Sequence, residues 1–215
     1  MRTDSARPAR YTMMGPALLG VLTLVACGPK PANDTSRAET PGAVDTAATG
    51  MAPADTAAMA SNAKLSDANI VALLDEANKA DSASGAFALK KASDPGVKSF
   101  AKMMMGEHHA LRVQGQALAK KLKVTPEAPA DDPVAKAGAA EMDALNAAGS
   151  GAAFDRAYID QEVTIHKAVL DLADKAHGDT ENGELKALIE KAKPTIQKHL
   201  DKAEELQQKL GKATT

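Results

Sequence analysis

The chain of 215 residues is long enough for one sizeable domain with appendages, and its hydrophobic content of 44% suffices for a buried core. A net charge of −2, with aromatic residues at only 2%, excludes the usual nucleic-acid-binding classes, which need basic patches. Ala, Lys, Glu, Leu and Met dominate the second half of the chain, and these strong helix formers predict an all-α domain.

The first 26 residues have the pattern of an export signal. Three arginines precede an apolar run at 17–26 (ALLGVLTLVA), which is shorter than the ~20 residues of a membrane-spanning helix. The run ends in Leu-Val-Ala-Cys, which resembles the bacterial lipobox, and Cys27 is the only cysteine in the chain. We therefore expect a lipoprotein signal peptide over residues 1–26 and lipidation at Cys27. An ordinary secretory signal that happens to contain a cysteine is the alternative.

The resemblance to a lipobox implies a location in the cell envelope. Several acyl chains on Cys27 would give a stable membrane anchor. Gly28 follows the cysteine, where the inner-membrane retention signal would have Asp, so we expect the outer membrane, facing the periplasm. Residues 27–64 are rich in Ala, Thr and Pro and carry few large apolar side chains, which predicts a disordered tether.

The bundle domain is expected over residues 65–212 and begins with a helical hairpin. Ser66 is a suitable N-cap for a helix that runs to about Ser93, and the turn at 94–96 (Asp-Pro-Gly) ends it. A second helix follows to about Leu122. Its apolar positions recur at alternating steps of four and three, which is the pattern of a bundle seam, and His108 lies on that seam.

A Pro-rich segment and a short helix over 134–148 lead to a second hairpin. On the short helix we expect Ala139, Met142 and Leu145 to share the buried side. The third main helix is expected from a Ser150 cap to about His177, with Gly178 as its C-cap. The fourth is expected over 180–210. Its seam is Leu185, Ile189, Ala192, Ile196, His199, Ala203, Leu206 and Leu210.

Two long hairpins joined by a connection of this length predict a four-helix bundle of the ferritin-like type, with one long crossover. A simple up-down-up-down bundle is the alternative, because a short helix can lie either along or across a bundle.

Ligand-type side chains occur at mid-height on every main helix. His108 and Asp81 are equally far from the first hairpin turn, and His199 is level with Glu162 or His166 about the second. A metal ion would satisfy all of these buried polar groups together. The candidate metal ligands are Asp81, Glu107, His108, Glu162, His166 and His199. A metal-free polar layer, with Asp81 and His108 as a buried pair that fixes register, is the alternative.

The ligand types suit Fe, Mn, Zn or Cu. The chain lacks the Glu-x-x-His spacing of di-iron bundles, because Glu162 and His166 are four residues apart. Three consecutive methionines at 103–105 suit Cu(I), but successive helical side chains diverge by ~100°, so at most two can point inward. We find no nucleophile with its base, no phosphate-binding loop and no paired catalytic acids, so no catalytic residue is predicted.

Three stretches resemble an uncharacterised bacterial domain-of-unknown-function family, whose members are labelled putative outer-membrane or periplasmic proteins of ferritin-like fold. They are VKSFAKMMMGEHH (97–109), GAAFDRAYIDQEVTIH (151–166) and KPTIQKHL (193–200). The likeness extends from about Ser66 to Leu210. Matching features are Glu107 before His108, the phrase Phe154-Asp155-x-x-Tyr158 followed by His166, Pro194-Thr195 followed by His199, and an acidic residue on the first helix at Asp81. The resemblance implies fold and envelope location but no activity.

Three classes of function follow. The first is a lipid-anchored metal-binding module for storage, sensing or buffering. The second is a metal-dependent oxidoreductase acting against oxidative stress in the envelope, and the third is a structural or protein-interaction lipoprotein with a metal-free core. The membrane is the one predicted partner, through Cys27, and a protein partner is not specified by the sequence.

Overall fold

The computed structural model describes residues 63–212, which form five helices and contain no strand. The helices are α1 (Asp67–Lys91), α2 (Pro95–Leu122), α3 (Pro133–Ala147), α4 (Ala152–Asp179) and α5 (Gly183–Lys212). The prediction of an all-α domain is confirmed. The predicted signal peptide, Cys27 and nearly all of the predicted tether lie outside the described residues.

Local sequence signals explain most of the helix ends. Ser66 caps α1, and Asn69 returns the hydrogen bond in a reciprocal capping box. Asp94 caps α2 ahead of Pro95, as the turn sequence predicts. The start of α4 differs from the prediction, because the N-cap is Gly151, at φ 73°, and not Ser150. Gly151 donates its N–H to the carbonyl of Lys91, which places it against the end of α1. The left-handed backbone favours glycine there.

The second hairpin turn also differs in detail. The helix continues through Gly178 to Asp179, and Thr180 is the C-cap. The Thr180 hydroxyl accepts a hydrogen bond from the backbone N–H of Asn182. The Asn182 side chain then accepts from the backbone N–H groups of Glu184 and Leu185, so α5 begins at Gly183. Two polar side chains replace the glycine cap that the sequence suggests.

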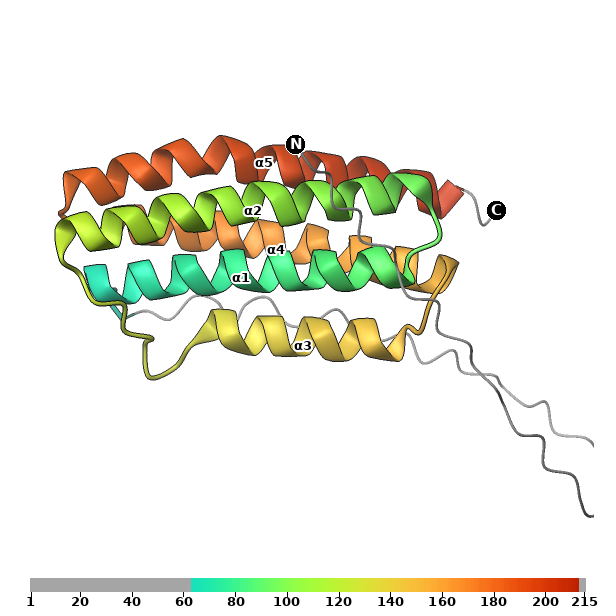
Figure 1. The fold of residues 1–215 in the computed structure, drawn as a ribbon, viewed down its shortest axis with the longest axis horizontal. Helices are drawn as coiled ribbons and strands as arrows, with labels where there is room; N and C mark the ends of the chain where they lie inside the picture. The colour runs from blue at the N-terminus through green and yellow to red at the C-terminus, as the bar shows by residue number, and fades with distance from the viewer. Residues whose placement is uncertain (1–62, 213–215) are drawn as a thin grey trace, which may run out of the picture. The chain divides into compact units, whose positions relative to one another are not determined.

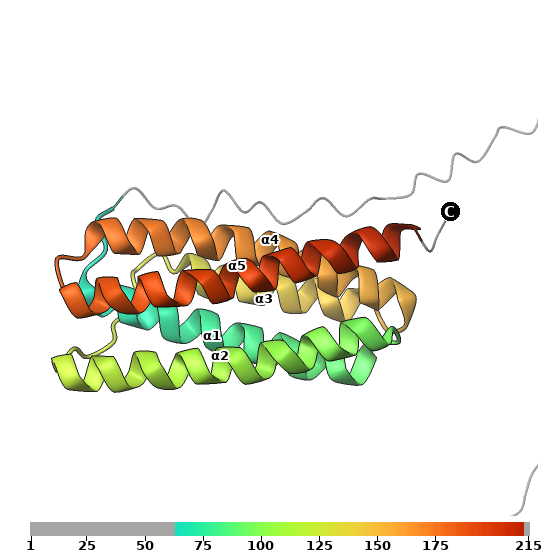
Figure 2. The same ribbon diagram turned by 90° about the horizontal axis from the view of Figure 1, so that it is seen from above.

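α1 and α2 form one antiparallel hairpin, and α4 and α5 form the other (Figure 1). α3 runs back along the bundle against α1 and α4, so that α2 and α4 run in the same direction (Figures 1 and 2). The connection is therefore a single long crossover that contains a short helix. The more specific assignment to the ferritin-like bundles stays a prediction.

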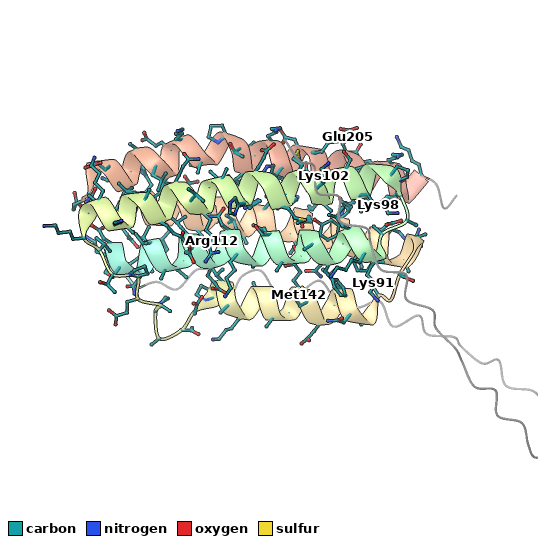
Figure 3. The ribbon with its side chains drawn as sticks, viewed as in Figure 1. Lys91, Lys98, Lys102, Arg112, Met142 and Glu205 are labelled. Atoms are coloured by element: carbon teal, nitrogen blue, oxygen red, sulfur yellow. The ribbon has the colours of Figure 1, made fainter. Side chains whose placement is uncertain are left out.

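The interior contains two large apolar clusters. One surrounds Phe100, Met104, Phe154 and Tyr158, and Met142 of α3, labelled in Figure 3, packs against it. The other surrounds Leu73, Leu185 and Ile189. The seam predicted for α5 is buried except at Ala192, which is half-buried. On α2 the seam is buried only as far as His108, and the seam residues beyond it are half-buried, with Leu111 and Gly115 lining a groove.

The α3 prediction was wrong in part. Leu145 is fully buried and Met142 is partly buried, but Ala139 is exposed. The buried residues of α3 are Pro133, Val134, Glu141 and Leu145. Because Ala is abundant on every side of this helix, its apolar pattern specifies its orientation poorly.

The beginning of the described chain is attached to the opposite hairpin. The backbone N–H of Leu65 donates to Asp179 Oδ2 at 2.9 Å, and the Thr180 hydroxyl donates to Asp67. Both bonds join the start of α1 to the turn between α4 and α5. Among the described residues, none of the helices is long and apolar enough to cross a membrane.

Candidate metal centre

Three histidines meet at the middle of the bundle. His108 comes from α2, His166 from α4 and His199 from α5, and each is at most 2% exposed. One ring nitrogen from each residue lies within 4.8 Å of the other two. The prediction that these side chains point inward at one level is thus met by the geometry.

The ring of His108 is oriented through its Nδ1. This nitrogen lies 3.0 Å from Asn78 Oδ1 and 3.2 Å from Asp81 Oδ2. The Asn78 amide nitrogen donates to the carbonyl of Leu74, which fixes the amide with its oxygen toward the ring. Both neighbours of Nδ1 are acceptors, so Nδ1 carries the proton and Nε2 keeps a lone pair.

The ring of His166 is oriented by the preceding turn of its own helix. Its Nδ1 lies 2.9 Å from the backbone carbonyl oxygen of Glu162 and 3.3 Å from Glu162 Oε2. A carbonyl oxygen can only accept, so Nδ1 is again the protonated nitrogen. The Nε2 atom is fully buried and has no hydrogen-bond partner among the described residues.

The ring of His199 is oriented through its Nε2, whereas those of His108 and His166 are oriented through Nδ1. Its Nε2 lies 2.9 Å from Glu107 Oε2, and Lys198 donates to the other oxygen of Glu107 at 2.9 Å. Hydrogen bonds from Lys198 and His199 lower the pKa of Glu107, so this carboxylate is ionised and accepts. The proton of His199 is therefore on Nε2, and its Nδ1 has a lone pair.

The remaining nitrogens of the three rings converge. His108 Nε2 and His199 Nδ1 are 3.2 Å apart, and neither has a proton to share when the outer nitrogens are protonated. The unpartnered Nε2 of His166 belongs to the same group, since its ring centroid is 5.7 Å from that of His108 and 5.4 Å from that of His199. Three lone pairs thus face one another in a buried space, which is costly unless a cation or a proton lies between them.

The imidazoles are neutral at physiological pH. Burial lowers the pKa of His108, His166 and His199 to about 4 in each case, and the carboxylates beside them only partly oppose this effect. Neutral imidazole is the form that binds metal ions.

The predicted carboxylate ligands lie beside the outer nitrogens of the imidazole rings, away from the point where the inner nitrogens converge. Glu107 accepts a hydrogen bond from His199 Nε2, and carboxyl oxygens of Asp81 and Glu162 lie 3.2 and 3.3 Å from the Nδ1 atoms of His108 and His166. All six candidate residues therefore belong to one connected group, in which imidazoles face inward and carboxylates lie behind them. Carboxylates in this position hold a metal-binding imidazole in one tautomer and raise its basicity.

Sequence reasoning missed Glu141 of α3, which is 1% exposed and lies close to Asp81. Its signal was present, because Val134, Glu141 and Leu145 are spaced by seven and four residues and share one helix face. It also missed Asn78, which contacts the His108 ring only because the two residues lie at the same level on the two helices of the first hairpin.

The Phe-Asp-x-x-Tyr phrase has a structural explanation. Phe154 and Tyr158 stack in the core at a centroid distance of 6.3 Å. Asp155 is 1% exposed and accepts hydrogen bonds from the Ser93 backbone N–H (2.8 Å), the Ser93 hydroxyl and the Asp94 backbone N–H (2.9 Å). It ties α4 to the turn between α1 and α2 and lies apart from the histidines.

Fold and site together define an all-helical bundle protein with three buried histidines at its centre, suitably placed to hold a metal ion. The family model described as "Domain of unknown function (DUF4142)" matches residues 51–206. The chain therefore belongs to the DUF4142 family, in agreement with the resemblance in its sequence motifs. No curated protein and no solved structure matches the chain.

Proposed function

We propose that this protein binds one divalent transition-metal ion between His108, His166 and His199. The observation that carries the proposal is the arrangement of the ring nitrogens and their acceptor atoms. Each imidazole has one nitrogen bonded to an acceptor oxygen, and its other nitrogen faces a common buried point.

The nitrogen spacing suits direct coordination. Metal–nitrogen bonds of about 2.0–2.1 Å in tetrahedral geometry place two ligand nitrogens about 3.3 Å apart. His108 Nε2 and His199 Nδ1 are already 3.2 Å apart, so binding would need little movement of these two rings. Three imidazoles leave a fourth position for water or another small ligand.

Charge and ligand type support a first-row transition metal. Three neutral imidazoles do not reduce the charge of a divalent ion, but the ionised Glu107 lies behind His199. Asp81 and Glu162 lie behind His108 and His166, and burial raises the pKa of both carboxyls, so a bound cation would favour their ionisation. Imidazole favours Zn, Cu, Fe or Ni over Mg or Ca. Among the predicted metals, Zn, Fe and Cu suit an all-imidazole set better than Mn.

A groove opens close to the buried site. It has a volume of about 390 Å³ and is lined mainly by apolar side chains of both hairpins. Asn78, which holds the His108 ring, lines it, and so does Ile196, one turn before His199. Arg112, labelled in Figure 3, pairs with Asp75 at 2.9 Å on the lining of the groove.

We also propose that this bundle is ferritin-like and belongs to a lipoprotein anchored in the bacterial outer membrane through Cys27. The one-crossover order of the helices supports the first part. The apolar run, the small residues and the single cysteine in sequence support the second. In that location the site would serve to store, sense or buffer a metal in the envelope. Replacing Cys27 with Ser should abolish incorporation of labelled palmitate.

Elemental analysis of the full chain, purified without a histidine tag and loaded with Zn²⁺ or Co²⁺, tests the metal site. The wild type should retain metal through desalting, and His166→Ala and His199→Ala should each lose it. His109→Ala is the matched control, because His109 adjoins His108 but is exposed, and it should bind like the wild type. Circular dichroism verifies that each variant folds, and His199→Gln provides a version that retains more of the side-chain volume.

Coordination can be tested independently of occupancy. Co²⁺ bound by nitrogen ligands in a four-coordinate site gives strong visible absorption, which should be absent from the His166 and His199 variants. Failure of the folded wild type to bind any of these metals would refute the proposal. It would leave a metal-free polar layer as the explanation of the three histidines.

A further inference from the structure

The groove between the two hairpins is long and narrow. Its lining covers positions 111–120 of α2 and 185–196 of α5, which extend over ~14–17 Å at ~1.5 Å rise per residue. Its volume of about 390 Å³ falls within the ~300–1,000 Å³ of ligand pockets in proteins. A molecule that fills it must therefore be small and elongated.

Small residues on the facing seams leave this space open. Gly115 occupies a seam position of α2, and a Cβ atom added there would meet no other atom within 4 Å. Ala192, the half-buried member of the α5 seam, also lines the groove. Protein interiors are normally packed without gaps of this size, so the space between these two helices is left for another molecule.

The lining is mainly aliphatic. Val169 of α4 and Ile196 of α5 remain 8% and 5% exposed, although both belong to the apolar interior. Leu74 of α1 and Leu111 of α2 complete the same surface and are half-buried. Among the described residues that line the groove none is aromatic, so it favours a flexible hydrocarbon chain over a planar ring, which would stack on aromatic side chains.

One edge of the groove is polar. Arg112, Gln116 and Lys120 follow one another at steps of four on α2 and line the same side. Arg112, labelled in Figure 3, donates from Nε to Asp75 Oδ1 at 2.9 Å and from Nη2 to Asp75 Oδ2 at 3.2 Å. Gln116 donates to Asp75 Oδ1 at 2.7 Å. Both oxygens of Asp75 are thus engaged by groups of the protein.

This edge has an excess of positive charge. Asp75 is the one acidic residue of the lining, whereas Arg112 and Lys120 are both basic. Within residues 63–212, Arg112 Nη1 makes no hydrogen bond and Lys120 forms no ion pair. A guanidinium with free N–H groups is suited to bind a carboxylate.

We infer that the groove binds one unbranched fatty acid, with its carboxylate at Arg112 and its chain along Gly115 and Ala192. An apolar chain complements the aliphatic lining, and an anionic head complements the positive edge. This ligand site is separate from the three histidines and does not depend on a bound metal.

The first test is calorimetric titration of the full chain, in a chelator, with hexanoate, octanoate and decanoate. Each acid should bind once per chain, and the affinity should rise about fourfold for each added CH₂ until the groove is full. Octan-1-ol and octylamine have the same chain with a neutral and a cationic head. Both should bind at least about tenfold more weakly than octanoate, because neither provides a carboxylate for Arg112.

A pair of glycine variants tests the location. Gly115→Leu fills the groove and should abolish octanoate binding. Leu is a stronger helix former than Gly, so the variant should fold at least as well as the wild type. Gly106→Leu is the matched control, because a Cβ there also meets nothing within 4 Å, but Gly106 is exposed and does not line the groove. It should bind octanoate like the wild type.

Arg112→Gln tests the position of the head group. It should weaken octanoate binding about tenfold and leave octan-1-ol binding unchanged. A general disturbance of the fold would weaken both ligands, so equal losses for the two would overturn the role of Arg112.

Other results would also contradict the proposal. A folded wild type that binds none of the three acids would refute it outright, and equal binding of octanoate, octan-1-ol and octylamine would refute the anionic head. Octanoate binding retained by folded Gly115→Leu would exclude the groove as the location. Wild-type dimers in light scattering that Gly115→Leu converts to monomers would assign the groove to a second copy of the chain. All of these measurements are made without metal, so the three-histidine site stands or falls separately.

Discussion

Replacing Glu141 with Gln should make the metal-free protein more stable as the pH rises, relative to the wild type. The Glu141 carboxyl has a pKa of about 8 in the folded chain, against an ordinary value of 4.5, chiefly because it is buried. Between these two pH values the unfolded chain has lost the proton while the folded chain retains it. The folded state is therefore favoured below pH 4.5, and this advantage is lost as the pH rises toward 8.

The magnitude follows from the two pKa values. Each pH unit within this window removes about 1.4 kcal/mol from the free energy of unfolding. At pH 7 the loss is about 3 kcal/mol, which for a bundle of this size corresponds to a fall in Tm of about 6–12 °C. Gln does not titrate, so this contribution is absent from the variant.

The assay is urea unfolding followed by circular dichroism, in a chelator, at several pH values between 4.5 and 8. The quantity of interest is the change with pH in the difference between Glu141→Gln and wild type. A change in the free energy of unfolding that the new amide causes equally at every pH does not affect this quantity. Glu205→Gln should show no such change, because Glu205 is exposed. A difference that stays flat across this range would refute the assignment of Glu141 as a buried acid.

Further changes test other parts of the bundle. Asp155→Ala removes three hydrogen bonds at the Ser93 turn, two of them from backbone N–H groups, and should lower the free energy of unfolding by about 3–5 kcal/mol in urea titration. Gly85→Ala would place Cβ 2.9 Å from the backbone oxygen of Ala101, so it should cost about 1–3 kcal/mol by the same assay, whereas Gly106→Ala, in open space, should not. The three imidazoles, whose pKa falls from 6.5 to about 4, should make the metal-free protein less stable as the pH drops through this window, and His166→Gln should show a shallower loss. Equal slopes for His166→Gln and wild type would contradict the buried neutral state of that ring.

The seam pattern predicted much of the interior, because a four-three spacing specifies which face of a long helix is buried. It placed His108 and His199 inside, and both are fully or nearly fully buried. Counting from the hairpin turns then predicted which residues share a level, since the rise per residue of a helix is constant. The same logic put Glu162 and His166 beside them.

The sequence could not predict how protons and ring nitrogens would be arranged. Asp81 and Glu162 were expected as candidate ligands, and their carboxyl oxygens lie 3.2 and 3.3 Å from the outer nitrogens of His108 and His166. α3 was harder still, because alanine on all its sides gives little preference for one face. Glu141 is buried by the packing of α3 on α1 and α4, which is a property of the assembled bundle.

The bonds from Leu65 to Asp179 and from Asp67 to Thr180 bear on how the bundle would respond to pulling. If the N-terminal end is fixed to a membrane, tension enters the bundle at Leu65. Those two bonds hold the start of α1 against the second hairpin, so α1 would begin to peel away from the bundle only after they break.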